Sequence, residues 1–192
     1  MIKEGFAVTG GEDSDDAVMY VAESNKWKQL TRLLKVLIKR DWHGSVFLKN
    51  LLFVFGGSIN GIESSSVHYL DESGSWHVVP QLPNRVNFPE VVSTDNYDVF
   101  LMDTFFTNKL YKMDVETKLW VSKARLPGDV SKGARTIYAK DRLYVVGGKK
   151  KIIAWYIPST DSWLHGAKHQ HLHFYGAVMH QKNTILLVGG ES

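Results

Sequence analysis

The sequence contains no cysteine among its 192 residues, so disulfide bonds, thiolate metal sites and cysteine nucleophiles are all excluded. No apolar run approaches the ~20 residues that a membrane-spanning helix requires, and residues 1–6 lack the apolar core of a signal peptide. The net charge of +3 is small and scattered, which argues against a nucleic-acid-binding surface. These absences favour a cytoplasmic globular protein, without nucleic acid or membrane among its partners.

Aromatic residues are abundant by contrast, with six Trp, eight Tyr and nine Phe, and this composition favours strands over helices. The hydrophobic share of 44% and the charged share of 22% are ordinary for a globular protein. The sequence is long enough for one sizeable domain.

Glycine doublets recur behind short apolar runs, and a tryptophan follows each of the first three doublets after 16 to 20 residues. At a fifth position of the repeat the sequence reads Asp103-Thr104 and is followed by Trp120. We therefore interpret Asp103 as a degenerate copy of the glycine doublet that keeps the left-handed backbone turn. The steps between copies are then 46, 47, 44 and 42 residues, and a fixed period of this size indicates a repeat architecture. The residues that define the repeat are Gly10, Gly11, Trp27, Gly56, Gly57, Trp76, Trp120, Gly147, Gly148, Trp163, Gly189 and Gly190.

Each repeat contains four short segments rich in β-branched and aromatic residues, which predicts four strands. In the clearest copy the predicted strands are 136–139, 143–146, 152–156 and 163–164. The other predicted strands are 45–48, 51–55, 67–70 and 76–79; 90–93, 99–102, 110–113 and 120–121; 6–9, 18–21 and 27–30; and 175–180 and 185–188.

Four-stranded units of this length are typical of the blades of a β-propeller. The doublets fit positions where the chain turns at positive φ near a crowded axis. Each tryptophan is expected to fill the wedge against the next blade and to bury roughly 150–250 Å².

Period, doublet and tryptophan together resemble the Kelch repeat, whose length is ~50 residues, over essentially the whole sequence. The resemblance implies an all-β, Kelch-type β-propeller that is incomplete, with about four four-stranded blades and a partial one. The expected repeats are roughly 5–41, 42–87, 88–132, 133–173 and a partial 174–192. Kelch domains of BTB–Kelch proteins resemble six-bladed rings, so we expect the last third of the ring, and the BTB and BACK domains, to be absent. The arginine that usually opens a Kelch blade is replaced by Asp41-Trp42, Phe88-Pro89, Lys132-Gly133 and Phe174-Tyr175.

Two other patterns leave alternatives open. Five histidines (His165, His169, His171, His173 and His180) gather near one end, and three of them could ligate zinc. No Asp or Glu lies between Asp161 and Glu191 to support such a site, so we favour a solvated loop and predict neither metal nor cofactor. Residues 30–40 have amphipathic helical spacing with a basic polar face, but a strand and a connecting loop fit the repeat better.

The resemblance places the loops after the doublets and the openings of the first strands around one mouth of the propeller. Exposed aromatic and basic residues there suit a peptide. The predicted partner-binding rim consists of Trp42, Ser58, Asn60, Phe88, Phe105, Phe106, Lys149, Lys150, His173 and Tyr175; Glu12 and Asp13 occupy corresponding positions.

The resemblance therefore implies protein recognition and no enzymatic activity. By this resemblance the chain is the substrate-recognition part of a BTB–Kelch adaptor for a cullin-3 ubiquitin ligase, with cullin-3 bound only through a separate BTB domain. An actin-binding scaffold is the alternative, and a loop-borne enzyme is the weakest one. Galactose-oxidase-like chemistry needs a Tyr–Cys cofactor, and the sequence lacks cysteine.

Overall fold

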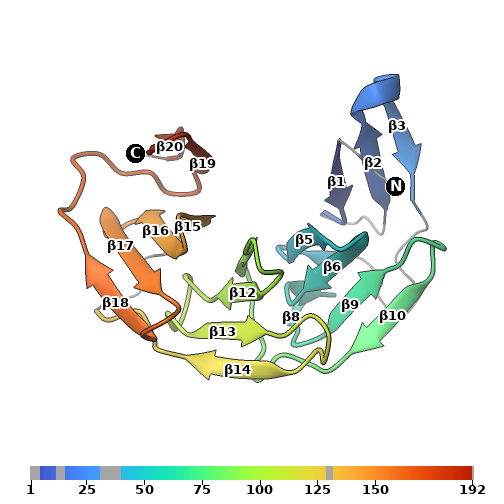
Figure 1. The fold of residues 1–192 in the computed structure, drawn as a ribbon, viewed down its shortest axis with the longest axis horizontal. Helices are drawn as coiled ribbons and strands as arrows, with labels where there is room; N and C mark the ends of the chain where they lie inside the picture. The colour runs from blue at the N-terminus through green and yellow to red at the C-terminus, as the bar shows by residue number, and fades with distance from the viewer. Residues whose placement is uncertain (1–4, 12–15, 31–39, 129–131, 192) are drawn as a thin grey trace. The chain divides into compact units, whose positions relative to one another are not determined.

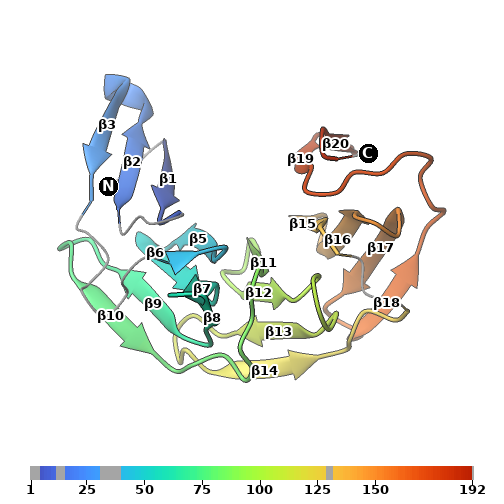
Figure 2. The same ribbon diagram turned by 180° about the vertical axis from the view of Figure 1, so that it is seen from behind.

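The computed structural model describes residues 5–11, 16–30, 40–128 and 132–191. The chain divides into two compact units, Met1–Pro89 and Glu90–Ser192. Antiparallel strands make up both units, and the one helical element of the described ranges is the 3₁₀ turn η1 (Ala22–Ser24). Figures 1 and 2 show the strands of each unit as separate sheets.

Unit 1 contains three sheets. The first has the order β1-β2-β3 and the second the order β10-β9-β6-β5, while β4, β7 and β8 form a small third sheet. The strands are β1 (Gly5–Thr9), β2 (Ala17–Val21), β3 (Lys26–Gln29), β4 (Arg40–Asp41), β5 (Gly44–Leu48), β6 (Leu51–Phe55), β7 (Ser58–Ile59), β8 (Ile62–Glu63), β9 (Val67–Leu70) and β10 (Trp76–Val79).

Unit 2 contains two four-stranded meanders, β11-β12-β13-β14 and β15-β16-β17-β18, and the hairpin β19-β20. The strands are β11 (Glu90–Ser93), β12 (Val99–Met102), β13 (Leu110–Met113), β14 (Trp120–Lys123), β15 (Ala134–Ala139), β16 (Arg142–Gly147), β17 (Ile152–Ile157), β18 (Ser162–His165), β19 (Ala177–Gln181) and β20 (Thr184–Val188).

Side-chain alternation explains how the two meanders of unit 2 pack. Leu143 and Val145 of β16 point to the same face as Ala154 and Tyr156 of β17, because successive side chains of a strand face opposite ways. This face is fully buried against Phe100, Met102 and Leu110 of the neighbouring sheet. Trp163 packs against the same cluster and donates its Nε1–H to the carbonyl oxygen of Ala124 at 2.7 Å. The indole thus closes the wedge between its own sheet and the preceding one, whereas the prediction placed it against the next blade.

The tryptophan prediction fails in the first repeat. Trp76 is 8% exposed and lies in the core of unit 1 with Leu52, Val54 and Leu70. Trp27 is 56% exposed, although it stands at the equivalent place. Its strand β3 is an edge strand whose described residues are all exposed, so its ring contacts Tyr20 at 5.5 Å and does not enter the core.

The glycine doublets have positive φ throughout, from 58° at Gly56 to 125° at Gly11. Asp103 and Thr104 do not have positive φ, so Asp103 is not a degenerate left-handed turn. Its carboxylate is buried and accepts three hydrogen bonds from the loop that follows. The prediction for this position was therefore wrong: a side-chain-capped loop has replaced the glycine turn.

Residues 31–39, the centre of the amphipathic segment, lie outside the described ranges. Of its two ends, Leu30 packs against the core of unit 1, and Arg40 lies in β4 with its side chain fully buried. Arg40 therefore belongs to the interior of unit 1 and not to a solvated basic face.

Candidate functional site: an aromatic and cationic surface

A residue at the start of each of the last four repeats, the first residue in three of them and the second in the last, has a left-handed backbone. The φ angles are 49° at Trp42, 55° at Phe88, 72° at Gly133 and 59° at Tyr175. A bulky residue with positive φ is strained and uncommon; such strain persists where the surrounding structure enforces it, and it is concentrated at functional sites. Three of the four positions therefore hold a large aromatic side chain in a backbone conformation that suits glycine.

In unit 2 the structure brings together a set of residues from four separate loops. Phe105 and Phe106 lie 4.8 Å apart and edge to face, and Phe105 is stacked with Tyr175 at 6.5 Å. Tyr175 also packs on Phe174, at 4.0 Å between ring centroids. Lysine side chains cover these rings. We define the aromatic–cation cluster as Phe105, Phe106, Lys132, Lys149, Phe174 and Tyr175.

The two lysines of the cluster lie over aromatic faces. The Nζ atom of Lys132 is 5.1 Å from the ring centroid of Phe105 and 5.9 Å from that of Phe106. Lys149 Nζ is 4.9 Å from the centroid of Phe174. These distances are within cation–π range. Both lysines are exposed, as is Phe106 at 46% and Tyr175 at 37%, so the cluster presents cations and aromatic rings on one accessible surface.

Gly133 is the one residue of this set of four that is not aromatic, because the ring of Phe174 leaves no room for a side chain there. A Cβ atom at Gly133 would lie 2.2 Å from Cδ2 of Phe174. The absence of a side chain at Gly133 therefore leaves room for Phe174, which supports both Tyr175 and Lys149.

Arg135 is hydrogen-bonded to the segment that carries Tyr175. Its Nε–H donates to the carbonyl oxygen of Gly176 at 2.6 Å, and Nη1 pairs with Glu90 Oε1 at 2.6 Å. Glu90 Oε2 accepts the backbone N–H of Thr136 at 3.0 Å. Burial raises the pKa of Glu90, while Arg135 and the hydrogen bonds oppose that rise. The guanidinium also lies 5.8 Å from the Tyr175 ring centroid, so this ion pair positions the edge of the cluster.

The Asp103 loop positions the other edge. Asp103 Oδ1 accepts the backbone N–H groups of Phe105 at 3.1 Å and Phe106 at 2.9 Å. Oδ2 accepts the hydroxyl of Thr107 at 2.6 Å. One buried carboxylate thus fixes two neighbouring aromatic residues that face the lysines.

Unit 1 carries a smaller aromatic patch. Trp42, 55% exposed, is stacked on Phe88 at 4.8 Å, and Phe88 N–H donates to the Trp42 carbonyl oxygen at 3.0 Å. Asn60 is exposed in the β7–β8 turn, whereas Ser58 is only 3% exposed in β7. Ser58 therefore does not face a partner directly. Glu12 and Asp13 lie outside the described residues.

Arg40 of unit 1 is fully buried, and its hydrogen bonds are made to uncharged oxygen atoms. Its Nη1 donates to Gly56 O at 2.7 Å, and Nη2 donates to Ser66 Oγ at 2.5 Å. Burial lowers the pKa of Arg40 to about 10. Burial, and secondarily the positive charge of Arg40, lowers the pKa of both His43 and His68 to about 4. Both imidazoles are therefore neutral at physiological pH.

Two of the remaining rim residues lie beside the cluster. Lys150 is exposed next to Lys149. His173 Nδ1 donates to the carbonyl oxygen of Gly189 at 2.7 Å, which attaches this residue to the turn after β20. Sequence reasoning named Phe105, Phe106, Lys149 and Tyr175, but it missed Lys132 and Arg135 as contributors. Their position next to the repeat opening at Gly133 is the signal that could have identified them.

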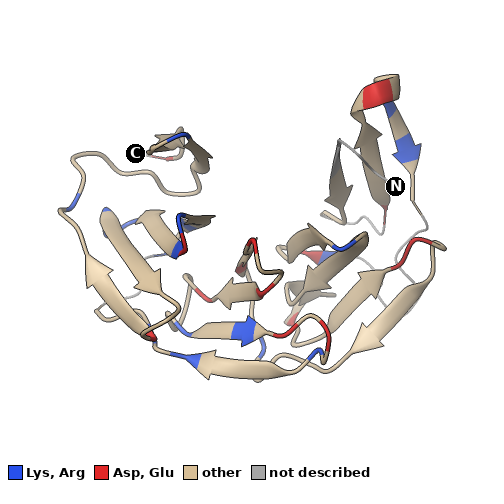
Figure 3. Ribbon diagram, in the orientation of Figure 1, with Lys and Arg blue, Asp and Glu red and all other residues tan. Residues whose placement is uncertain are grey.

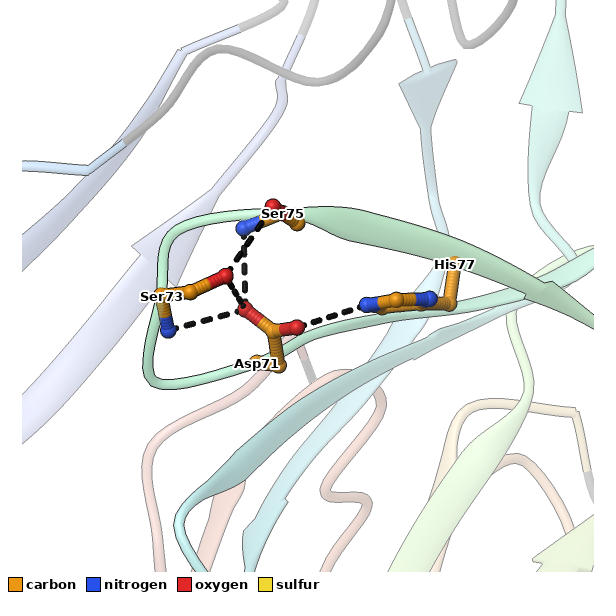
Figure 4. A network of polar contacts seen from close by, with 4 residues as sticks. All are labelled: Asp71, Ser73, Ser75 and His77. Atoms are coloured by element: carbon orange, nitrogen blue, oxygen red, sulfur yellow. Dashed lines mark hydrogen bonds and ion pairs between the residues drawn. The ribbon is translucent and has the colours of Figure 1, made fainter.

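Another polar network has a structural role. In the turn between β9 and β10, Asp71 Oδ1 accepts Ser73 N–H and Ser75 N–H, each at 2.9 Å, and Oδ2 contacts His77 Nε2 at 2.6 Å (Figure 4). Hydrogen bonds from Ser73, Ser75 and His77 hold the pKa of Asp71 below its usual range. This turn belongs to one hairpin, and the network stabilises its tight geometry.

The charged residues do not form a single stripe. Lys and Arg lie on several strands and loops, whereas Asp and Glu lie mostly in turns (Figure 3). No three His, Asp or Glu side chains of the described residues gather closely enough to hold a metal ion. No helix of the described ranges is long and apolar enough to cross a membrane.

Comparisons with known proteins agree on one family of repeats. The Kelch motif matches residues 43–83. Kelch-like protein 35 of Mus musculus is 26% identical over 172 residues, which is 86% of this chain and 29% of that protein. The solved structure of YjhT superposes with a TM-score of 0.74 at 16% identity, covering 88% of this chain and 64% of that one. The chain thus spans less than a third of its mouse relative. Together with the sheets described above, these matches support a partial Kelch-repeat domain with the all-β fold of a Kelch-type propeller.

Proposed function

We propose that this Kelch-repeat domain binds a protein partner through the aromatic–cation cluster of unit 2. One observation carries the proposal. Tyr175 stays in a strained left-handed conformation while its ring, with Phe105, Phe106 and two lysines, forms an exposed surface. Tyrosine is enriched among the residues that dominate the binding energy of protein interfaces, and phenylalanine is also enriched in interfaces.

The partner's segment fits in an extended form whose apolar side chains contact the phenylalanine rings. Because Lys132 and Lys149 lie directly over these rings, the surface offers positive charge within reach of every apolar contact. An acidic residue flanking an apolar one complements this arrangement. The likeness to Kelch-like protein 35 supports the further proposal that the chain selects substrates for a cytoplasmic cullin-3 ubiquitin ligase, through a BTB domain elsewhere in the polypeptide. Recognition, and not catalysis, is the proposed activity.

The binding proposal can be tested with peptides selected against the purified 192-residue chain from a random display library. Phe106→Ala removes an exposed ring that does not fill the core, so the variant should fold normally. We expect its affinity for the selected peptides to fall about 30-fold, a typical loss for an aromatic anchor. Lys132→Glu should weaken binding to a similar extent, by charge reversal. Fluorescence polarisation measures both.

Leu119→Ala is the matched control, because Leu119 is an apolar side chain of the same unit that is 58% exposed and lies outside the cluster. Its peptide affinity should equal that of the wild type. If Phe106→Ala and Lys132→Glu bound every selected peptide as tightly as Leu119→Ala does, the cluster would not be the binding surface. Sequencing the transcript upstream of the Met1 codon tests the adaptor role separately, because that role requires an encoded BTB domain. Co-sedimentation with actin filaments tests the scaffold alternative.

A further inference from the structure

Strands β16 and β17 carry apolar side chains on both of their faces. The face that holds Leu143 and Tyr156 is buried in the core of unit 2. Successive side chains of a strand point to opposite faces, so the other face presents the residues in between. These residues form two cross-strand pairs, Tyr144 with Trp155 and Val146 with Ile153. We call these four residues the aromatic wall.

The aromatic wall borders a pocket of about 430 Å³ within unit 2, and this volume is in the range of small-molecule sites, ~300–1,000 Å³. Ile185 and Leu187 of β20 also line the pocket, as does the segment between β18 and β19. A backbone hydrogen bond from Gly166 N–H to Ile153 O at 2.8 Å attaches that segment to β17. The pocket therefore has apolar residues of three strands in its lining and a supported segment at its border.

The equivalent wall of the preceding repeat packs against an aromatic ring. Phe100 and Met102 of β12 stand at the places that Tyr144 and Val146 take in β16, in both cases one repeat earlier. Trp163 packs against the core cluster that contains Phe100 and Met102. The aromatic wall thus repeats a surface on which an indole packs, and a flat aromatic ring suits the pocket for the same reason.

The charge of the lining favours an anion. Of the described residues that line the pocket, none is Asp or Glu, and Lys140 is the one with a permanent positive charge. Lys140 is exposed in the turn between β15 and β16, so its ammonium group can reach a ligand at the open end. Burial lowers the pKa of His169, and charge repulsion from neighbouring histidines and from Lys151 lowers it further. The positive potential of this lining is therefore not balanced by acidic side chains of the pocket.

We propose that this pocket binds a small aromatic carboxylic acid in its ionised form. The ring of the ligand packs on Tyr144 and Trp155 and also contacts Ile185 and Leu187, all of which line the pocket. Its carboxylate accepts a charge-assisted hydrogen bond from the Lys140 ammonium group. No residue of the aromatic–cation cluster lines this pocket, so the site is separate from the peptide-binding proposal and does not depend on it.

Isothermal titration calorimetry of the purified 192-residue chain with sodium α-naphthaleneacetate at neutral pH tests this site. We expect one saturable site with a dissociation constant on the order of 100 µM, as suits the binding energy that a ligand of this size reaches. The neutral analogue α-naphthaleneacetamide has the same rings and should bind about tenfold more weakly, because it lacks the charge that strengthens the hydrogen bond from Lys140. Sodium acetate has no ring and should give no saturable heat.

Lys140→Gln should weaken binding of α-naphthaleneacetate about tenfold and change binding of the neutral amide by less than about threefold. A folding defect would weaken both ligands alike, so the difference between them reports the charge contact. Lys182→Gln is the matched control and should bind both ligands as the wild type does. Lys182 is likewise exposed in a hairpin turn of unit 2 with positive φ, 55° against 49° at Lys140, and it does not line the pocket.

A second measurement locates the site in the wild-type chain. The photoreactive acid para-carboxybenzophenone is irradiated with the protein, and mass spectrometry identifies the labelled residues. Labels should fall on Ile153, Ile185 or Leu187 and should disappear when excess α-naphthaleneacetate competes. Absence of saturable α-naphthaleneacetate binding, an equal effect of Lys140→Gln and Lys182→Gln, or competed labels found only outside the pocket would each overturn the proposal.

Discussion

Replacing Asp103 with glycine is expected to destabilise unit 2 by about 3 kcal/mol, although this change restores the glycine found at the equivalent place in the other repeats. The Asp103 carboxylate is 4% exposed and accepts hydrogen bonds from Phe105 N–H, Phe106 N–H and the Thr107 hydroxyl. Its removal leaves buried donors unsatisfied, at roughly 1–3 kcal/mol for each buried group. Urea unfolding followed by circular dichroism measures the decrease in stability.

Asp103→Asn is the informative control, because its amide oxygen still accepts the two backbone N–H groups. We expect it to lose about half as much stability as Asp103→Gly. The interpretation of Asp103 as a degenerate glycine turn predicts the opposite order, with Asp103→Gly more stable than the wild type. A gain in unfolding free energy for Asp103→Gly would therefore contradict the loop described here.

Gly57→Ala is expected to destabilise unit 1 by about 3 kcal/mol or more, in the range of overpacking and backbone strain together. A Cβ atom at Gly57 would lie 2.5 Å from Asp41 O, 2.8 Å from His43 Cβ and 2.9 Å from His43 Cα. Two of these atoms are backbone atoms, so no side-chain rotation relieves the contact. The φ of +84° adds left-handed strain, of about 1–2 kcal/mol for an L-residue.

Gly61→Ala separates crowding from backbone strain. Gly61 has a φ of +76°, and a Cβ atom there would meet nothing within 4 Å. We expect a decrease of about 1 kcal/mol in the unfolding free energy of this variant, measured by the same urea unfolding. If Gly57→Ala and Gly61→Ala were destabilised equally, the close approach of β4 and the following loop to Gly57 would not explain why glycine is kept there.

The positions of the strands could be predicted because alternation and turn residues repeat with the blade. The predicted strands 51–55, 67–70 and 76–79 coincide with β6, β9 and β10. The small sheet of β4, β7 and β8 could not be predicted, since each strand has two residues and no periodic pattern is visible over that length. The exposure of Trp27 could not be predicted either, because the repeat pattern carries no information on whether a neighbouring sheet covers an edge strand.

The candidate site was predicted in part. The half-buried Phe105 and the exposed Phe106 and Tyr175 follow from their place in the repeat. Lys132 and Arg135 could not be predicted, because their contacts join residues that are 27 and 45 positions apart in the sequence. Ser58 was wrongly expected at the surface, since it lies in β7 beneath the turn that exposes Asn60. The buried role of Arg40 likewise depends on the Gly56 and Ser66 oxygens, which no local pattern reveals.

The most direct test of the account is to measure folding stability and peptide affinity together for Tyr175→Gly. Glycine accepts the φ of 59° at this position, which relieves about 1–2 kcal/mol of backbone strain. This relief offsets the missing packing of the tyrosine ring and the backbone entropy of glycine, ~0.5–1 kcal/mol. We predict unfolding free energy within about 1 kcal/mol of the wild type, with affinity for the selected peptides reduced about 100-fold, as for a central aromatic anchor. Unchanged affinity, accompanied by a large decrease in stability, would show that Tyr175 serves the fold and not recognition.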